Sequence, residues 1–296
     1  MKWWLKVGLA LVIMVVIAFF GVAGFLGYSM TRVERVWVEE SPTQFGLDYE
    51  DVSFPSIGDD LTLRGWYLPA DDSQQIIIMV HGEGYHRADP NIGMLDIASG
   101  LVEHNYSVLT IDLRGHGESE GDKISAGYYE TRDLLGAVEY AKGRGFEDIG
   151  VLGFSMGAVT SLLAAAENSD IDAVVSDSAF ADLNDMVEPE FRKRTGFPVI
   201  LLRPLLFMVK VMYGVDFLAI KPVSVVAGIA PRPIFFIHGE MDETIPVEHA
   251  YKLKEAAQAS KDQLWVVPQA GHVRAYVTHP EEYLDKVATF FGEVLR

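Results

Sequence analysis

The sequence of 296 residues contains no cysteine. This absence excludes disulfide bonds, metal sites built on thiolates and a cysteine nucleophile. Basic residues are also scarce, because 24 lysines and arginines stand against 42 acidic residues and leave a formal net charge of −18. Domains that bind nucleic acid usually carry a basic surface for its phosphates. We therefore expect no nucleic-acid partner.

The chain also lacks internal repeats, low-complexity tracts, a Walker Lys-Ser/Thr motif and a G-x-G-x-x-G turn that opens a helix. Phosphate-loop and dinucleotide-binding sites are therefore not indicated, and we expect no metal or organic cofactor. Hydrophobic residues make up 49% of the chain and aromatic residues 11%. This composition is typical of a protein with a buried core, and the length allows one large α/β domain or two small ones.

Part of the apolar content is an uncharged run at the N-terminus, Val7–Met30. As a helix that rises about 1.5 Å per residue, these 24 residues would extend roughly 36 Å. The hydrocarbon core of a bilayer is about 30 Å thick. Trp3, Trp4 and Tyr28 stand near the two ends of the run, and aromatic side chains favour membrane interfaces. We therefore predict a transmembrane anchor over residues 1–30, with the lipid bilayer as its partner.

Two other interpretations of this run compete with the anchor. The core helix of a soluble domain is seldom apolar all round for more than about 14 residues. A cleaved signal peptide is the closer alternative, because Gly21-Val22-Ala23 loosely fits a small-x-small cleavage site. The apolar run continues past that site to Met30, and this favours an uncleaved, single-pass anchor.

The charges that flank the run bear on its orientation. Lys2 and Lys6 precede it, while Arg32 and Arg35 follow it at the start of a polar connector, 31–48. The positive-inside bias is therefore slight. A short basic tail ahead of a long domain still favours a cytoplasmic tail and an extracytoplasmic domain.

Strand and helix patterns alternate through the rest of the chain, 49–296. The expected strands are Tyr49–Phe54, Leu61–Leu68, Gln75–Val80, Ser107–Leu113, Asp148–Phe154, Ile171–Ser176, Ile234–His238 and Gln263–Val267. The expected helices are Asn91–Glu103, Tyr128–Lys142, Met156–Glu167, Glu248–Gln258 and Glu281–Leu295. The first two strands should form an antiparallel pair. The alternation predicts an α/β fold whose sheet is mostly parallel and has helices on both faces.

A G-x-S-x-G pentapeptide, Gly153-Phe154-Ser155-Met156-Gly157, lies between an expected strand and an expected helix. The pattern is typical of a nucleophile elbow, in which a sharp strand-to-helix turn exposes a serine. The two glycines let the turn close without Cβ clashes. The serine oxygen then lies at a helix N-terminus, whose partial positive charge favours a developing anion. Ser155 is therefore the candidate nucleophile.

A serine hydroxyl is a weak nucleophile and needs a base, most often a histidine. In the chain order serine, acid, histidine, the candidates are His249, His272 and His279. His249 and His279 lie at the starts of expected helices, and His249 comes too soon after the strand that should carry the acid. His272 follows a strand, at the sheet edge where ligands bind in open α/β folds. His272 is therefore the candidate base.

The acid should lie in the loop after the strand that precedes His272. That loop offers Glu240, Asp242 and Glu243. Glu240 comes almost directly off the strand and Glu243 can face solvent, so Asp242 is the candidate. Asp177, after the previous strand, remains an alternative. The acid would hold the imidazole in one tautomer and stabilise the imidazolium.

A tetrahedral intermediate also needs backbone N–H donors for its oxyanion. Met156 directly follows the candidate nucleophile and supplies one candidate N–H. The second should come from the loop His81-Gly82-Glu83-Gly84, whose glycines let the backbone approach an oxyanion. The N–H of Glu83 is the first choice and that of Gly84 the second.

Five motifs in this order resemble the α/β-hydrolase superfamily. They are HGEG at 81–84, DLRGHGES at 112–119, GFSMG at 153–157, HGEMDETIP at 238–246 and AGH at 270–272. The second motif is similar to that of monoacylglycerol-lipase-like and serine-aminopeptidase-like members, and membrane-anchored bacterial hydrolases look similar as well. The resemblance implies an eight-stranded sheet and a triad of Ser155, Asp242 and His272. Glu83 departs from the small or apolar residue that often follows His-Gly in the family.

Two further expectations concern segments around this site. Asp112 and Arg114 should form hydrogen bonds beneath the active-site loops. A helical insertion is expected at about 184–230, where a short connection would normally suffice. Its most apolar part, Phe197–Tyr213, fits either a pair of core helices or a small lid whose apolar underside faces a pocket or the bilayer.

The sequence thus predicts a membrane-anchored serine hydrolase that cleaves carboxylic esters through an acyl-enzyme. Its partner would be a small-molecule ester or acyl substrate. A serine peptidase or aminopeptidase is the second interpretation, because the same triad cleaves amides. A non-catalytic binding protein on a hydrolase fold is the third.

Overall fold

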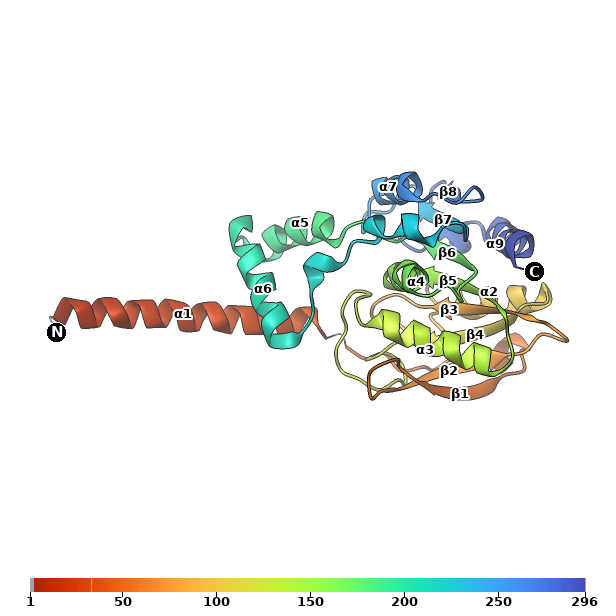
Figure 1. The fold of residues 1–296 in the computed structure, drawn as a ribbon, viewed down its shortest axis with the longest axis horizontal. Helices are drawn as coiled ribbons and strands as arrows, with labels where there is room; N and C mark the ends of the chain where they lie inside the picture. Colours follow the sequence, from red (N-terminus) through yellow and green to blue (C-terminus); the bar gives the residue numbers. More distant parts are fainter. Residues whose placement is uncertain (1–2, 33, 296) are drawn as a thin grey trace.

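A computed structural model of the chain describes residues 3–32 and 34–295 and contains one sheet of eight strands (Figure 1). Lys2, one of the two lysines ahead of the apolar run, lies outside the described residues. The strands are β1 (Glu50–Pro55), β2 (Thr62–Leu68), β3 (Gln75–Val80), β4 (Ser107–Asp112), β5 (Asp148–Phe154), β6 (Ala173–Asp177), β7 (Ile234–Gly239) and β8 (Gln263–Val267). These bounds agree with the expected strands to within a few residues.

The strand order is β1-β2-β4-β3-β5-β6-β7-β8. Only the pairs β1–β2 and β2–β4 are antiparallel, and every other pair of neighbours is parallel. The predicted α/β-hydrolase fold with a mostly parallel sheet is therefore confirmed. Because the strands from β3 to β8 run in one direction, the loops that follow them meet at one edge of the sheet.

Helices cover both faces of this sheet (Figure 1). They are α2 (Met94–Glu103), α3 (Glu130–Gly143), α4 (Met156–Glu167), α7 (Glu248–Ala256), α8 (Ala275–Thr278) and α9 (Pro280–Val294). Strand β3 shows why two layers are needed. Ile76 and Ile78 enter the core that α3, α4 and α7 cover, whereas Ile77 and Met79 enter the core under α2 and α9. A strand that is apolar on both faces can be stable only between two such layers.

The uncharged N-terminal run forms one long helix, α1 (Trp3–Met30), which projects away from the sheet and its covering helices (Figure 1). Every residue from Trp3 to Ala18 is exposed. Within the part of the chain that the structure describes, it is the one helix long and apolar enough to cross a membrane. A signal sequence would show the same length and composition, so both interpretations remain compatible with this helix.

The segment that follows α1 is held against the sheet and its covering helices, which together are called the body of the molecule. The guanidinium of Arg35 donates hydrogen bonds to backbone carbonyls of the loop after β4, namely those of His116, Gly117, Ser119 and Gly121. Thr31 accepts a hydrogen bond of 2.8 Å from the N–H of Ile124. Arg32 forms an ion pair of 2.7 Å with Asp122. These contacts fix where α1 leaves the body.

A helical insertion separates β6 from β7. It contains α5 (Leu183–Thr195), α6 (Leu202–Tyr213) and the short 3-10 helices η2 (Val199–Leu201), η3 (Phe217–Ala219), η4 (Pro222–Ser224) and η5 (Val226–Ile229). Helix α6 lies across the C-terminal part of α1 (Figure 1). The hydroxyl of Tyr213 donates a hydrogen bond of 2.8 Å to the carbonyl of Gly24. A Cβ at Gly27 would lie 2.3 Å from the Tyr213 ring, so this glycine permits the close approach.

Candidate active site

Ser155 lies at the turn between β5 and α4, with φ 53° and ψ −115°. Only a tight fit around the turn allows this unusual backbone conformation to persist. A Cβ at Gly157 would lie 2.2 Å from the carbonyl oxygen of Val80, and a Cβ at Gly153 would lie 2.4 Å from that of Gly157. Because these neighbours are backbone atoms that cannot move aside, both positions require glycine. The local structure is the one that the G-x-S-x-G pattern predicted.

Two loops from distant parts of the chain bring a histidine and a carboxylate to Ser155. The Oγ of Ser155 lies 2.9 Å from Nε2 of His272, and Nδ1 of His272 lies 2.7 Å from Oδ2 of Asp242. An ionised carboxylate can only accept, so Nδ1 carries the hydrogen and donates a hydrogen bond to Asp242. In the neutral ring Nε2 is then the acceptor for the serine hydroxyl. The geometry therefore suits transfer of the serine proton to the histidine.

Asp242 is buried and held ionised by its surroundings. Its Oδ1 accepts hydrogen bonds from the N–H groups of Thr244 and Ile245, at 2.9 and 2.8 Å. A second histidine, His238, lies with Nε2 3.4 Å from Oδ2 of Asp242. Burial alone would raise the pKa of Asp242, but its contacts with His238 and His272 outweigh burial and hold that pKa well below its ordinary value.

His238 is a residue of this site that the sequence interpretation missed. It is buried at the end of β7, and its Nε2–H donates to the carbonyl of Ile245 at 2.8 Å. Burial lowers the pKa of His238, yet the contact with Asp242 leaves a net rise. The position of His238 four residues before the candidate acid was the available signal. A sequence alone does not tell whether two such side chains face each other across a loop.

Asp177, the alternative acid, has other partners. Its carboxylate accepts hydrogen bonds from the hydroxyls of Ser178 and Tyr283, at 2.9 and 3.2 Å. Burial raises the pKa of Asp177 to about 6. The Oγ of Ser178 in turn accepts a hydrogen bond of 3.2 Å from the N–H of Val273, next to His272. Asp177 therefore supports the histidine loop from below, while Asp242 occupies Nδ1 of His272.

The other two histidines considered from the sequence form hydrogen bonds with the backbone away from Ser155. Nδ1 of His249 accepts a hydrogen bond of 3.0 Å from the N–H of Ala181. His279 stands at the N-terminus of α9, as expected, but its side chain does not cap that helix and instead lies 3.2 Å from the carbonyl of Pro268. Neither ring contacts Ser155.

The two loops proposed to supply oxyanion donors both lie beside Ser155. Met156 is the first residue of α4, so its N–H has no acceptor one helical turn earlier. A Cβ at Gly82 would lie 3.3 Å from the Cβ of Ser155, which shows how closely the loop after β3 approaches. The N–H of Gly84 donates to Nε2 of His116 at 3.1 Å. Gly84 is therefore already engaged with the loop after β4, and Glu83 and Gly84 both stay candidates for the second donor.

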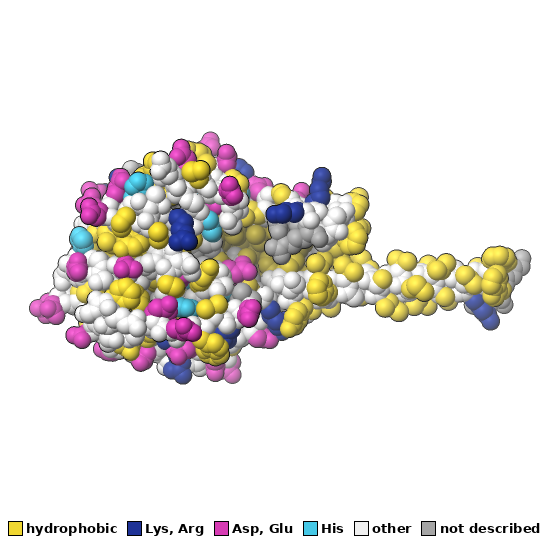
Figure 2. All heavy atoms as spheres, turned by 180° about the vertical axis from the view of Figure 1, so that it is seen from behind, with side chains coloured by type: hydrophobic (Ala, Val, Ile, Leu, Met, Phe, Trp, Pro, Cys, Tyr) yellow, Lys and Arg dark blue, Asp and Glu magenta, His cyan; other side chains and the backbone are white. Residues whose placement is uncertain are grey.

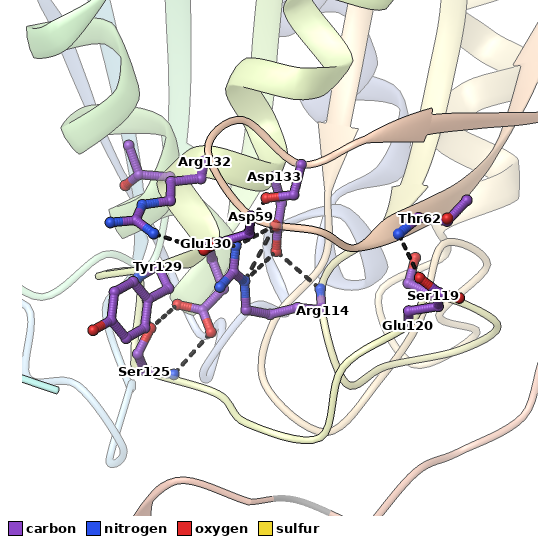
Figure 3. A network of polar contacts seen from close by, with 12 residues as sticks. Asp59, Thr62, Arg114, Ser119, Glu120, Ser125, Tyr129, Glu130, Arg132 and Asp133 are labelled. Carbon is purple, nitrogen blue, oxygen red and sulfur yellow. Dashed lines mark hydrogen bonds and ion pairs between the residues drawn. The ribbon is translucent and has the colours of Figure 1, made fainter. Parts of the chain in front are cut away.

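The DLRGHGES loop forms a buried polar network beneath the site. Asp112 accepts hydrogen bonds from the N–H and guanidinium of Arg87 and from the N–H of Glu118. Arg114 donates to Asp133 and Asp59, and Figure 3 shows this cluster of charges around its guanidinium. The expected hydrogen bonds of Asp112 and Arg114 are thus confirmed. Buried charges that are all paired can hold a loop rigidly.

His116 in the same loop makes the folded state sensitive to acid. Burial lowers the pKa of His116 to about 4 from an ordinary value of 6.5, although its hydrogen bond to Arg114 opposes the shift. At high pH the ring is neutral in both the folded and the unfolded chain. As the pH falls from 6.5 toward 4, only the unfolded chain binds this proton, so the folded state loses up to about 3 kcal/mol.

We therefore expect the unfolding temperature of the His116→Gln variant to fall less between about pH 7.5 and pH 4.5 than that of the wild-type protein. Glutamine can still accept the hydrogen bond from Gly84, but it does not titrate. Thermal unfolding in detergent, followed by circular dichroism at several pH values, measures the two slopes. Parallel slopes would show that His116 does not contribute to the acid sensitivity.

No group of three or more histidine, aspartate or glutamate residues with the geometry of a metal site occurs within residues 3–32 and 34–295. The polar groups around Ser155 are instead engaged with one another, as described above. The chemistry that this arrangement can perform is nucleophilic attack by a serine that is assisted by a histidine.

Comparison with known proteins agrees with this arrangement. The model of the Alpha/beta hydrolase family matches residues 77–286. The uncharacterized protein YqkD of Bacillus subtilis is 30% identical over 239 residues, which are 78% of this chain and 76% of that protein. The human serine hydrolase BPHL is 28% identical over 222 residues, which are 64% of this chain and 74% of BPHL.

Solved structures show the same relationship. The chain is similar to the esterase Pf2001 of Pyrococcus furiosus with a TM-score of 0.75 and 28% identity, over 90% of this chain and 99% of the esterase. The family model covers well over half of the present chain, including every strand from β4 to β8 and most of β3. The chain belongs to the Alpha/beta hydrolase family.

Proposed function

We propose that this protein is a serine hydrolase that cleaves carboxylic esters by acyl transfer. One observation carries the proposal: the chain of hydrogen bonds from Ser155 through His272 to Asp242, at 2.9 and 2.7 Å. A nucleophile, a base and an orienting acid in this order are the parts that acyl transfer requires. The family and the esterase neighbour support the same reaction class.

The proposed reaction has two halves. Ser155 attacks the ester carbonyl while Nε2 of His272 takes the hydroxyl proton, and the alcohol then leaves with that proton. Water attacks the acyl-enzyme in the same way and releases the acid. Asp242 stays ionised throughout, since its low pKa keeps it from taking the proton, and it stabilises the imidazolium. The N–H groups of Met156 and Glu83 would bind the oxyanion.

The proposed substrates are carboxylic esters, with amides as the second class. The similar Pyrococcus furiosus protein is an esterase, which favours esters. Cleavage of peptides or aminoacyl amides uses the same residues and remains the second candidate. A long apolar helix beside the domain favours an ester derived from lipid over a highly polar one.

We further propose that α1 is an uncleaved membrane anchor with the catalytic domain on the extracytoplasmic side. The supporting observations are its length of 28 residues and the exposure of its first part. The packing of α1 also supports retention, because cleavage after Ala23 would remove Phe19 and Ala23, which belong to the same apolar core as the buried side of α6.

A fluorophosphonate probe tests the enzyme proposal directly. We expect the purified full-length protein to react covalently with the probe at Ser155, since such probes need an activated serine. Peptide mass mapping locates the adduct. Protein that is folded by circular dichroism yet stays unlabelled would contradict the proposal and favour a non-catalytic binding protein.

The same preparation can separate the two substrate classes. We expect p-nitrophenyl esters of several chain lengths to be hydrolysed faster than aminoacyl and peptide p-nitroanilides. A labelled enzyme that cleaves only the anilides would replace the esterase assignment with a peptidase.

A further inference from the structure

Helix α6 and the 3-10 turn before it carry apolar side chains that no part of the described chain covers. The buried side of α6 is complete, because Leu202, Leu205, Leu206 and Val209 recur at helical spacing and pack on the core. On the opposite side Ile200, Phe207 and Val211 are 81%, 61% and 64% exposed. A helix that only completes a core would present polar residues there.

These exposed residues form one stripe with a basic edge. At 100° per residue, Phe207 and Val211 fall within about 40° of each other on the surface of α6, and Ile200 lies in the 3-10 turn that leads into this helix. Arg203 and Lys210 flank the stripe on one side, and both side chains are largely exposed. Arg203 pairs with Glu188 at 3.7 Å and Lys210 with Asp216. An apolar stripe beside basic residues is typical of a helix that lies in a membrane interface.

The surrounding sequence has an unusual charge for this chain. Residues 191–215 contain five basic residues and no acidic residue, although the chain as a whole has a net charge of −18. A local excess of lysine and arginine is attracted to anionic lipid headgroups. The negative charge of the whole chain predicts repulsion from such headgroups. In this part of the insertion the local charge is positive, so attraction is expected instead.

The distance along α1 from its N-terminal tryptophans to the crossing with α6 is close to the thickness of a bilayer core. Contacts with α6 occur at Gly24 and Gly27, whereas Trp3 and Trp4 lie at the other end of α1. Twenty residues from Trp4 to Gly24 correspond to about 30 Å of helix, which is about the thickness of the hydrocarbon core. If the tryptophans mark one interface, α6 therefore lies at the other.

The picture of the surface agrees with this placement. In Figure 2 hydrophobic side chains line the edge of the insertion that faces along α1, and they continue onto α1 itself. Because α6 lies across α1, a helix that spans the bilayer would place α6 roughly in the membrane plane (Figure 1). Tyr28 and Arg32, which stack at 4.6 Å, lie just beyond this level, where headgroups would be.

We propose that the α5–α6 insertion docks on the lipid surface, with the stripe Ile200, Phe207 and Val211 immersed at the headgroup–acyl boundary and Arg203 and Lys210 directed to anionic headgroups. The inference rests on the anchor proposed for α1 and not on the reaction. It makes the protein a two-point membrane binder: α1 crosses the bilayer, and α6 sets the distance and tilt of the catalytic domain above it.

Site-directed spin labelling tests the docking, and the absence of cysteine makes every introduced cysteine unique. The full-length variants Phe207→Cys and Val211→Cys carry a nitroxide in vesicles of phosphatidylcholine and phosphatidylglycerol. Val12→Cys, in the exposed part of α1, reports the anchor. Tyr251→Cys, an exposed aromatic position on α7, is the matched control in the body. Thermal unfolding of each labelled protein verifies its fold.

The measured quantity is the accessibility of each label to dissolved oxygen relative to a water-soluble nickel chelate. We expect this ratio to be severalfold higher at 207 and 211 than at 251, and highest at 12. A membrane value at 12 together with a water value at 207 and 211 would overturn the docking while the anchor stands. A water value at 12 would overturn the anchor and the docking together, without bearing on the enzyme.

A second copy of the chain is the competing occupant of the stripe. In that case labels at 207 and 211 would be shielded from both oxygen and chelate, and their spectra would show spin–spin broadening that vanishes on dilution with unlabelled protein. That outcome would replace the lipid surface with a dimer interface.

Discussion

Replacing Ser155 with alanine should lower kcat for p-nitrophenyl ester hydrolysis by about 10⁶-fold, because loss of a serine nucleophile leaves only binding and oxyanion stabilisation. The substitution removes the one atom that His272 contacts at 2.9 Å and leaves the backbone turn in place. The fold should therefore survive, which circular dichroism can verify. Initial rates over a range of substrate concentrations separate the effects on kcat and KM.

The matched control is the same substitution at a distant serine. Ser73 precedes β3 at the opposite edge of the sheet, where its hydroxyl donates to the carbonyls of Gln75 and Asn105 and accepts from the N–H of Gln75. We expect Ser73→Ala to keep nearly full activity. If Ser155→Ala also hydrolysed esters at the wild-type rate, another residue would be the nucleophile and the proposed mechanism would be wrong.

Replacing Asp242 with asparagine should lower kcat by about 10⁴-fold, because an amide at this position favours the wrong tautomer of the neighbouring imidazole. In the wild-type protein Oδ2 of Asp242 accepts a hydrogen bond of 2.7 Å from Nδ1 of His272, which leaves Nε2 free to act as the base. An amide NH₂ in that place would favour a ring protonated at Nε2, which faces Ser155 and could not accept its proton. The KM should change little.

Asp177→Asn is the matched control for this variant. It changes a buried carboxylate of the same type at the same edge of the sheet, but its partners are Ser178 and Tyr283. We expect its kcat to stay within about tenfold of the wild type. The double variant Ser155→Ala/Asp242→Asn should be no slower than Ser155→Ala alone, since the residues act as a unit. A larger loss for Asp177→Asn than for Asp242→Asn would reverse the assignment of the acid.

Much of the fold could be predicted because its signals are local. The run QIIIMV indicated a strand buried on both faces, and β3 is that strand, at the centre of the sheet. The G-x-S-x-G pattern specified its own turn, since the clashes that exclude a Cβ at Gly153 and Gly157 involve residues within the turn or in the adjacent strand. The order of the strands across the sheet could not be predicted in this way, because it depends on contacts between distant segments.

Choices among similar residues needed the tertiary structure. Asp177 and Asp242 both follow parallel strands, and chain order alone left both open. In the structure the loop after β7 brings Asp242 to Nδ1 of His272, while Tyr283 on α9 engages Asp177. Similarly, only the structure shows that His116, far along the chain, accepts a hydrogen bond from the N–H of Gly84.

The sequence by itself indicated a hydrolase and gave Ser155 as the candidate nucleophile, because a strained turn and a helix N-terminus are built from neighbouring residues. It also determined that an apolar helix precedes an acidic domain. Only the tertiary structure decided that α6 lies across that helix at Gly24 and Gly27 and leaves its own apolar stripe uncovered. Contacts between segments almost two hundred residues apart depend on how the whole chain folds, and the local pattern of either segment does not specify them.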